Sequence, residues 1–274
     1  MTDSCIPWVG GKKALRGKIV SMFPDYYKNY IEVFGGAAWV LFYKDPRHDF
    51  EVYNDLNSLL CNFFRCVQDK PNELMDNLRY ALNSREDFLL AQKRLADPNC
   101  GTEVQRAAWY YKVIRQSYSA STESFGARPR SIRSTFPLIE RAYLRLEDVL
   151  IENRDFSQII RGYDHTDTLF YCDPPYHGTE EYYKGIGDEG FTEADHIRLR
   201  DSLLKIQGKF LLSYNDDAFV RDLYNDPGLF LTEVKRPDSM RQRTKPGTMF
   251  SELIISNYPP PPTQFSLFDY EMAS

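Results

Sequence analysis

The sequence predicts an α/β fold, in which an open parallel sheet is covered by helices and interrupted by a mostly helical insertion. Two strand-turn-helix units follow one another at residues 30–44 and 50–67. Segments with helical spacing then occupy residues 71–117, and strands alternate with helices again after residue 145. Because consecutive strand-turn-helix units are typical of parallel sheets, the middle segment reads as an insertion into one.

The start of the sheet is expected in the first two units. Residues 5–24 read as a glycine loop that leads into a short basic helix. In the first unit, IEVF has the character of a buried strand, GGAA of a tight turn and AWVLFY of an apolar helix. In the second unit we expect a strand at 50–54, a polar turn, and a helix that opens near Asp55.

The insertion is expected over residues 65–145. Three segments within 71–117 have helical spacing and helix-start residues, and a loop rich in Ser, Gly, Pro and Arg occupies 118–136. A further helix, at about 137–148, leads back to a strand at 149–155.

The sheet pattern then resumes. Thr192 is a plausible N-cap, with Asp195 three residues on as the partner in a capping box. The remaining expected elements are a strand at 168–173, a long loop at 174–190, a helix at 191–206, a strand at 209–216, a helix at 217–224, a strand at 229–234, a basic loop, and a last strand at 252–258.

Composition narrows the class of protein without identifying it. The 274 residues are 42% hydrophobic, enough for a sizeable core, and no apolar run or signal peptide indicates a membrane. Five cysteines without a CxxC pair indicate neither a disulfide framework nor a zinc site, so we expect a cytoplasmic protein. The net charge of −5 argues mildly against nucleic acid, but the basic stretches 126–134 and 234–247 offer local patches.

Three acids come directly after predicted strands, where parallel sheets bind ligands: Asp55, Asp155 and Asp173. The small residues at 35–38 would let a ligand approach the backbone, and an acid after the next strand can bind ribose hydroxyls. Because the phosphate fingerprint GxGxxG is absent, this pairing favours a nucleoside cofactor without phosphate, such as S-adenosylmethionine, over a dinucleotide. A tight turn with a helix-capping acid explains the same residues equally well.

The segment TLFYCDPPYHG, residues 168–178, ends a buried strand on a carboxylate and two prolines. Proline cannot continue a central strand, so Pro174 and Pro175 end the strand and stiffen the chain after it. Asp173 and the Pro174 carbonyl then form two fixed acceptors, which suit the two N–H donors of an exocyclic amine on a base. Tyr176 can stack on such a base, which would have to be flipped out of a duplex.

These residues resemble a known family. FYCDPPY resembles motif IV of amino-methyltransferases in the DPPY form typical of DNA adenine-N6 enzymes. WVGGKKALRGKIVSMFP, IEVFGGAAWV and YNDLN resemble the N-terminal, cofactor and acidic motifs of the DNA adenine methylase (Dam, D12 class) family. RDF, LLSYND and ELIISNY come next in the family's order, so the resemblance spans residues 6–258.

The resemblance implies a Rossmann-like S-adenosylmethionine-dependent methyltransferase that methylates N6 of a flipped adenine in DNA. It assigns residues 1–64 and 146–258 to the catalytic domain and 65–145 to a target-recognition insertion. DNA cytosine-N4 or RNA adenine-N6 methylation, or a catalytically inactive DNA-binding homologue, are the alternatives. Cytosine-N4 enzymes more often carry Ser in place of Asp173, and the intact Asp173, Lys12 and Asp55 argue against an inactive homologue.

The resemblance also implies site residues. The catalytic set is Asp173, Pro174, Pro175 and Tyr176. The cofactor set is Trp8 and Lys12 at the methionine end, Phe34, Gly35, Gly36 and Ala37 around it, Asp55 at the ribose, Asp155 and Phe156 at the adenine, and Phe191 as a cover. Ala38 stands where the family's FxGxG motif ends in glycine, so we expect a slightly remodelled turn that still binds the cofactor.

The expected DNA contacts lie in the insertion. IRQSYS, residues 114–119, stands where Dam-type enzymes have a segment close to NRYGYN that helps to choose GATC. Arg115 and Tyr118 match, but Ser119 replaces the asparagine, so GATC is not transferred to this chain. The candidate contacts are Arg115, Tyr118, Arg128, Arg130 and Arg133; a basic loop that touches only phosphate is the alternative for any single arginine.

Two further features have interpretations of their own. Cys172 precedes Asp173 without an adjacent base, so a structural role in the strand is favoured over a nucleophile. After the prolines of the tail, residues 259–274, Gln264, Leu267 and Phe268 form QxxLF, which resembles the bacterial sliding-clamp peptide. A chance match or a tail that packs on its own domain is the alternative. We expect no metal, and a monomer or weak dimer.

Overall fold

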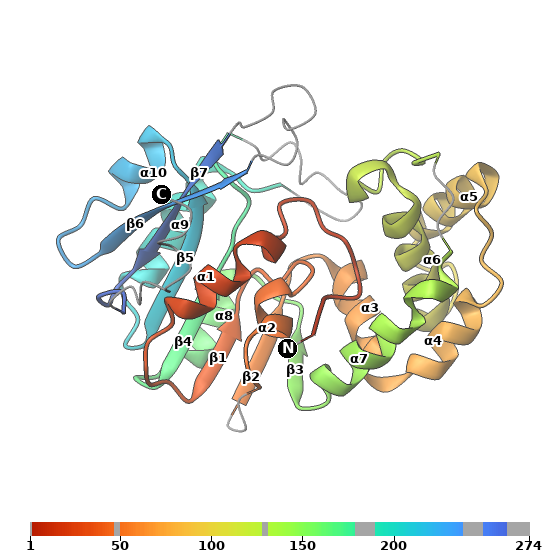
Figure 1. The fold of residues 1–274 in the computed structure, drawn as a ribbon, viewed down its shortest axis with the longest axis horizontal. Helices are drawn as coiled ribbons and strands as arrows, with labels where there is room; N and C mark the ends of the chain where they lie inside the picture. The colour runs from red at the N-terminus through yellow and green to blue at the C-terminus, as the bar shows by residue number, and fades with distance from the viewer. Residues whose placement is uncertain (1, 47–49, 128–130, 179–189, 238–248, 262–274) are drawn as a thin grey trace, which may run out of the picture.

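A single seven-stranded sheet organises the computed structural model, which describes residues 2–46, 50–127, 131–178, 190–237 and 249–261 (Figure 1). The strands are β1 (Asn29–Glu32), β2 (Phe50–Asn54), β3 (Val149–Glu152), β4 (Thr168–Cys172), β5 (Lys209–Asn215), β6 (Phe230–Pro237) and β7 (Met249–Ser256). Their order is β3-β2-β1-β4-β5-β7-β6. β1 to β5 run parallel, and β7 is antiparallel to both β5 and β6. The predicted α/β class is confirmed.

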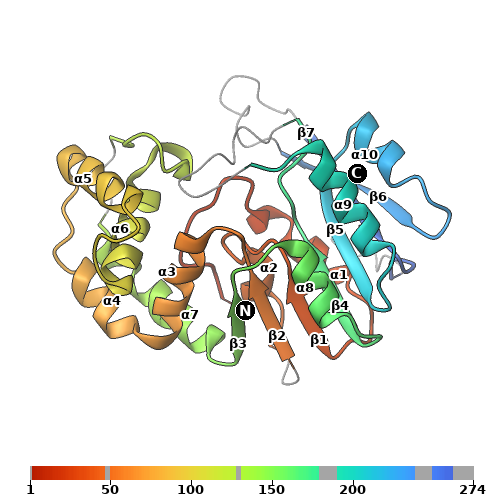
Figure 2. The same ribbon diagram turned by 180° about the vertical axis from the view of Figure 1, so that it is seen from behind.

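Helices cover both faces of the sheet. α1 (Arg16–Ser21) and α2 (Trp39–Tyr43) lie over one face, and α8 (Phe156–Tyr163) and α9 (Glu193–Leu203) lie over the other (Figures 1 and 2). α10 (Ala218–Leu223) lies near the β6 edge. The remaining elements gather beyond the β3 edge: α3 (Ser58–Asp69), α4 (Pro71–Leu78), α5 (Arg85–Ala96), α6 (Glu103–Gln116) and α7 (Phe136–Leu146). The described residues also form the short 3₁₀ turns η1 (Lys12–Ala14), η2 (Tyr118–Ala120) and η3 (Arg133–Thr135).

Alternate residues of the inner strands β1, β2, β4, β5 and β7 enter two separate cores. In β4, Leu169 and Tyr171 pack on the side of α1 and α2, whereas Phe170 and Cys172 pack on the side of α8 and α9. This is the two-residue period of a strand that is buried on both faces. The first core continues into residues 58–146, which carry α3 to α7 and which we call the helical unit. Phe63 of α3 and Tyr111 of α6 lie in this part of the core, and their rings stack with centroids 5.2 Å apart. The expected boundary at residue 65 therefore lies inside α3.

Three local details differ from the sequence-based expectations. The helix expected to open near Asp55 begins at Ser58, because the Asn57 side chain accepts the free N–H groups of Leu59 and Leu60. Helix α8 was not expected; it is only eight residues long and contains Gly162 near its end, which lowers its helix propensity. The last two strands form an antiparallel hairpin instead of extending the parallel sheet.

The capping box at the start of α9 is confirmed. The Thr192 hydroxyl accepts the N–H of Asp195, and the Asp195 carboxylate accepts the N–H of Thr192. Most of the long loop before this helix and most of the basic loop before β7 fall outside the described residues. Within the described part of the chain, no helix is long and apolar enough to cross a membrane.

Candidate active site

A cavity of about 330 Å³ lies at the carboxyl ends of β1, β2 and β4. Ligands of parallel sheets bind at such edges, because loops and helix N-termini converge there. Twelve residues predicted from the sequence line it: Trp8, Lys12, Phe34, Gly35, Gly36, Ala37, Asp55, Asp155, Phe156, Asp173, Pro175 and Phe191. Pro174 and Tyr176 are buried in the same segment, and the Lys12 ammonium lies over the Tyr176 ring. The structure thus brings together residues from distant parts of the chain.

The turn after β1 forms the floor of the cavity. Gly36 has a φ of 49°, and a Cβ there would lie 2.8 Å from Nε1 of Trp8. Ala38 also takes a left-handed conformation, with a φ of 56°, and its N–H donates to the Gly35 carbonyl at 2.7 Å. A residue with a Cβ loses about 1–2 kcal/mol in this conformation. The turn therefore keeps a backbone suited to glycine, although alanine occupies it.

Asp55 shapes this turn from the end of β2. Its carboxylate accepts the N–H of Gly36 at 2.8 Å and the N–H of Asn57 at 2.8 Å. Burial raises the pKa of Asp55, while the backbone N–H groups oppose that rise. Asp55 therefore does not cap a helix, because Asn57 caps α3; it holds the two turns together through their backbone N–H groups and also lines the cavity.

Three phenylalanine rings form an apolar wall on one side of the cavity. The ring centroids of Phe34 and Phe156 are 5.6 Å apart, and Phe191 lies 5.8 Å from Phe34 and 5.9 Å from Phe156. Such a cluster offers ring faces and edges to a planar ligand.

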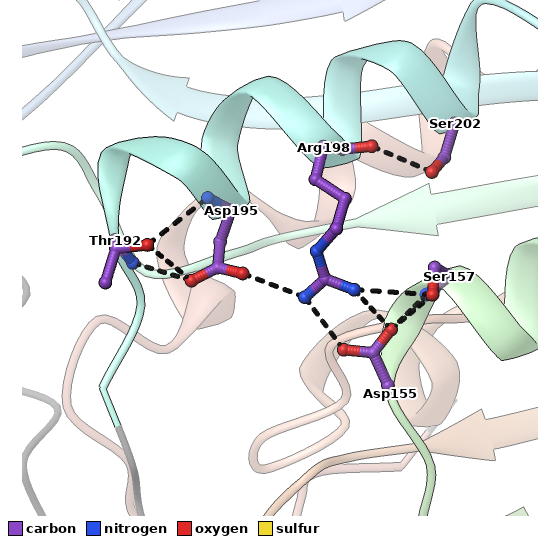
Figure 3. Close-up of polar contacts among 6 residues, drawn as sticks. All are labelled: Asp155, Ser157, Thr192, Asp195, Arg198 and Ser202. Carbon is purple, nitrogen blue, oxygen red and sulfur yellow. Dashed lines mark hydrogen bonds and ion pairs between the residues drawn. The ribbon is translucent and has the colours of Figure 1, made fainter.

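Arg198 of α9 pairs with Asp155, the acid beside this wall (Figure 3). Its two terminal nitrogens donate to the two oxygens of Asp155 at 2.7 and 2.9 Å, and one of them also donates to Asp195 at 2.8 Å. The guanidinium carbon lies 4.1 Å from the centre of the Phe156 ring. Burial alone would raise the pKa of Asp155, but the bonds from Arg198 and Ser157 lower it overall. Arg198 was not predicted from the sequence, because its partner is 43 residues away.

Residues 173–176, which the sequence predicts to hold the substrate and which we call the substrate segment, carry a buried ion pair. Nζ of Lys12 lies 2.7 Å from Oδ1 of Asp173 and 4.6 Å from the centre of the Tyr176 ring. Within the described residues, Oδ1 of Asp173 forms this ion pair with Lys12 and has no other hydrogen-bond partner. Burial raises the pKa of Asp173 to about 6, and Lys12 opposes this rise. The carboxylate is therefore ionised at neutral pH and can still accept a hydrogen bond.

Two buried acids were also missed from the sequence. Glu32 of β1 lines the cavity, is 2% exposed and accepts a bond from the Tyr30 hydroxyl at 2.6 Å. Burial raises the pKa of Glu32 to about 8. Glu252 of β7 is fully buried and accepts a bond from the Tyr176 hydroxyl at 2.6 Å. A signal existed in both cases, since each acid interrupts an apolar strand and a buried carboxylate requires partners.

The candidate DNA contacts differ in accessibility. Tyr118 is 63% exposed on η2, and Arg133 is exposed at the start of η3. Arg115 is only half exposed, because its guanidinium packs on the Tyr111 ring and donates to the Tyr111 hydroxyl at 3.2 Å. Arg128 and Arg130 lie outside the described residues, as do Gln264, Leu267 and Phe268 of the tail.

Cys172 lies in the core of the sheet. It is fully buried, and burial raises the pKa of its thiol far above the usual value, as the predicted structural role requires. The described residues contain no group of three or more His, Cys, Asp or Glu side chains arranged to hold a metal ion.

Comparison of the sequence with known proteins identifies the family of this chain. A family model for D12 class N6 adenine-specific DNA methyltransferases matches residues 8–242. The chain is 26% identical to the type II methyltransferase M1.LlaDCHI of Lactococcus lactis subsp. cremoris, over 92% of this chain and 94% of that protein. It is 26% identical to the DNA adenine methylase of Haemophilus influenzae, over 91% of each chain. Identity to the type II methyltransferase M.CviBI of Paramecium bursaria Chlorella virus NC1A is 22%, over 92% of this chain and 98% of that protein.

Proposed function

This chain belongs to the D12 class of N6 adenine-specific DNA methyltransferases, and we propose that its cavity holds S-adenosylmethionine next to the target adenine. Family and relatives identify the activity as site-specific methyl transfer to N6 of adenine in DNA. The observation that carries the residue assignment is the position of Asp173, which lies on the wall of the same cavity as Asp55 and Asp155. A cofactor and a base bound there would be neighbours.

The residues that line the cavity fit the chemical groups of the cofactor. We assign the ribose to Asp55, and the adenine to Asp155 with the rings of Phe34, Phe156 and Phe191. We assign the methionine end to Trp8, Lys12 and the 35–37 turn, all of which line the cavity. The two glycines of this turn make room for the rings of Tyr53 and Trp8. Glu32 adds a carboxyl group at this end, and a nearby ammonium would favour its ionised form. When bound, the sulfonium supplies an electrophilic methyl group.

Asp173 and Pro174 are assigned to the target adenine. The carboxylate and the Pro174 carbonyl accept the two hydrogens of N6, which frees the nitrogen lone pair for attack on the methyl group. The base stacks on Tyr176, in the place where Lys12 now lies 4.6 Å above the ring. Entry of the base therefore displaces the Lys12 ammonium, whose next carboxylate is Glu252 at 4.0 Å.

A proton must leave N6 once the methyl group has been transferred. Asp173 is well placed to take it, because its pKa of about 6 is nearer neutrality than that of an exposed aspartate. The proton then passes from Asp173 to solvent. Stacking on Tyr176 and the two fixed acceptors keep the base in line during this step.

The helical unit is assigned to target recognition. Tyr118 and Arg133 are exposed on this unit and are available to a duplex. A tyrosine can wedge between base pairs while a base is flipped, and arginine can read guanine edges. Because Ser119 breaks the resemblance to the GATC-reading segment, the recognition sequence has to be measured.

The tail supports a second, separate proposal. The QxxLF peptide after the prolines would tether the enzyme to a sliding clamp in the cytoplasm and raise its local concentration on DNA. Ending the chain after Pro262 should abolish clamp pull-down and leave methylation of short duplexes unchanged. Unchanged pull-down would remove this proposal without touching the catalytic one.

Calorimetric titration with S-adenosylhomocysteine tests the cofactor site directly. We expect binding to the full chain, and a loss of at least about tenfold in affinity for Phe156→Ala, which removes a ring from the proposed adenine wall. Leu144→Ala is a matched control, because Leu144 is 66% exposed on α7, away from the cavity. Equal affinity of all three proteins would contradict the assignment.

A further inference from the structure

Glu252 joins the substrate segment to the last two strands of the sheet. Its side chain is fully buried, and Oε2 accepts a bond from the Tyr176 hydroxyl at 2.6 Å. Oε1 accepts a bond from Nε of Arg236, on the neighbouring strand β6. One carboxylate therefore holds a tyrosine of the substrate segment with one oxygen and a cation of another strand with the other.

The antiparallel placement of β7 makes this contact possible. Glu252 pairs with Asn215, the last residue of β5, and with Val234 of β6. β5 lies next to β4, and the substrate segment leaves β4 at Asp173. Because β5 ends at the same edge of the sheet, this register places Glu252 at the level where that segment begins. If β7 ran parallel to β5, its C-terminal residues would lie at this edge in place of Glu252.

The energetics indicate a task for this carboxylate. The next three residues of β7, Leu253, Ile254 and Ile255, are apolar and at most 1% exposed. A charge in such a strand costs several kcal/mol unless ion pairing and hydrogen bonds offset the lost hydration. Arg236 supplies the opposite charge, while Lys12 lies 4.0 Å away. With Arg236 on one oxygen, Glu252 uses its other oxygen to bind the hydroxyl of Tyr176 in the active site.

The Tyr176 ring is also supported from one side. Phe250 of β7 lies nearly parallel to it, at 5° and with centroids 6.5 Å apart, and Arg236 lies 4.8 Å from the centre of the Phe250 ring. A tyrosine ring held only by its Cβ can tilt, whereas a bond at the hydroxyl fixes the far end of the ring and with it the direction of its long axis. The neighbouring rings of Phe250 and Tyr214 limit rotation about that axis, and the bond to Glu252 fixes the tilt.

We propose that Glu252, held in place by Arg236, is a positioning residue that fixes the tilt of the Tyr176 ring, on which the target adenine stacks. This inference rests on the proposed function of the substrate segment. Glu252 acts through Tyr176, so its loss should impair the capture and methylation of the flipped base and leave cofactor binding intact.

The test uses the full chain with Glu252→Gln, Tyr176→Phe and the double variant. Glu252→Gln removes the charge that Tyr176 and Arg236 bind. Tyr176→Phe removes the hydrogen bond between Tyr176 and Glu252 while keeping the ring. We measure kcat and KM on a duplex that contains the mapped target site, and the fluorescence of 2-aminopurine at the target position. We expect each single variant to lower kcat by about tenfold and to leave the flipped 2-aminopurine less quenched, because it stacks poorly on a loose ring.

The double variant distinguishes positioning from general damage. If both changes remove one shared bond, the double variant loses no more activity than the worse single variant. Independent structural damage would multiply the losses, weaken the binding of S-adenosylhomocysteine and lower the melting temperature. Glu233→Gln is the control, since it removes an exposed carboxylate of β6 that is paired with Arg221; its kinetics should match those of the unmodified enzyme.

Several outcomes would overturn the inference. Wild-type kcat, KM and fluorescence in Tyr176→Phe would do so, even if Glu252→Gln failed to fold. Losses that multiply in the double variant would do so as well. Failure of the proposed function is recognised separately, because Asp173→Ala or Tyr176→Ala would then keep full methylation. Loss of activity in those two variants, with Tyr176→Phe and Glu252→Gln unaffected, would reject the role of Glu252 alone.

Discussion

Lys12 and Asp173 form a buried ion pair, with 2.7 Å between Nζ and Oδ1, in the place assigned to the target adenine. The ammonium also lies over the Tyr176 ring, where the base is expected to stack. Under the proposed assignment, binding of the base exchanges one partner of Asp173, Lys12, for another. The protonation state of Asp173 can then be followed through the pH dependence of methylation.

The pH dependence of methylation should depend on Asp173. The proposed mechanism needs the ionised carboxylate as an acceptor, and burial raises its pKa to about 6. We expect kcat/KM for DNA to fall as the pH drops through about 6, because this ratio reports ionisation of the free enzyme. Since Lys12 lowers the pKa of Asp173, Lys12→Met should move this acid limb to higher pH.

Profiles for the unmodified enzyme, Lys12→Met and Lys13→Met at constant ionic strength check this expectation. Lys13 is a suitable control because it is exposed and pairs with Asp3 at the surface. If the acid limb stays at the same pH in Lys12→Met as in the unmodified enzyme, the ion pair between Lys12 and Asp173 does not set the pH at which activity falls.

Arg198 should support the cofactor and not the DNA. Its two bonds to Asp155 and its contact with the Phe156 ring fix the proposed adenine wall. We expect Arg198→Gln to weaken S-adenosylhomocysteine binding by about tenfold, with kcat at saturating cofactor and KM for DNA nearly unchanged. Titration calorimetry and steady-state kinetics measure the two effects. Arg221→Gln removes a surface arginine paired with Asp216 and serves as the control; equal affinities in both variants would contradict the prediction.

Ala38 should tolerate glycine but not a branched residue. Relief of left-handed strain in Ala38→Gly is offset by the greater freedom of the unfolded chain, so the free energy of unfolding should change by less than about 1 kcal/mol. Ala38→Val should lower it by about 3 kcal/mol or more, because a branched residue at positive φ is strained and the site is fully buried. Ala142→Val, buried in helix α7, isolates the effect of overpacking. Urea unfolding that showed equal losses for both valines would argue against backbone strain at Ala38.

Tyr118 should act on DNA alone. Because its ring is 63% exposed on the helical unit, Tyr118→Ala should leave the melting temperature and cofactor affinity unchanged. We expect kcat/KM for target DNA to fall by about tenfold, as a wedge that stabilises the flipped state is lost. Tyr80→Ala is the matched control, since Tyr80 is 83% exposed after α4. Identical kinetics in both variants would remove Tyr118 from the recognition surface.

The cavity could be located from the sequence because its signals are local. Asp55, Asp155 and Asp173 each come soon after a strand, and the rule that ligands bind at strand ends brings them together before any coordinates are known. The α/β class could be predicted from repeated units in the same way. Even the N-cap at Thr192 could be predicted, because its partner Asp195 is three residues away.

The contacts that could not be predicted join distant parts of the chain. Arg198 meets Asp155 across 43 residues, and Tyr176 meets Glu252 across 76. The second contact depends on β7 running antiparallel between β5 and β6, which a pattern of apolar residues does not reveal. Lys12 was expected at the cofactor, and only the fold shows that it also pairs with Asp173.

Methyl transfer by the full chain and its Asp173→Ala variant tests the role of the substrate segment most directly. Purified protein is incubated with labelled S-adenosylmethionine and unmethylated genomic DNA, and the product is sequenced for N6-methyladenine. We predict label on adenine within a defined sequence for the unmodified chain, and a loss of label with retained cofactor binding in the variant. Undiminished adenine methylation by Asp173→Ala would contradict the role assigned to this segment.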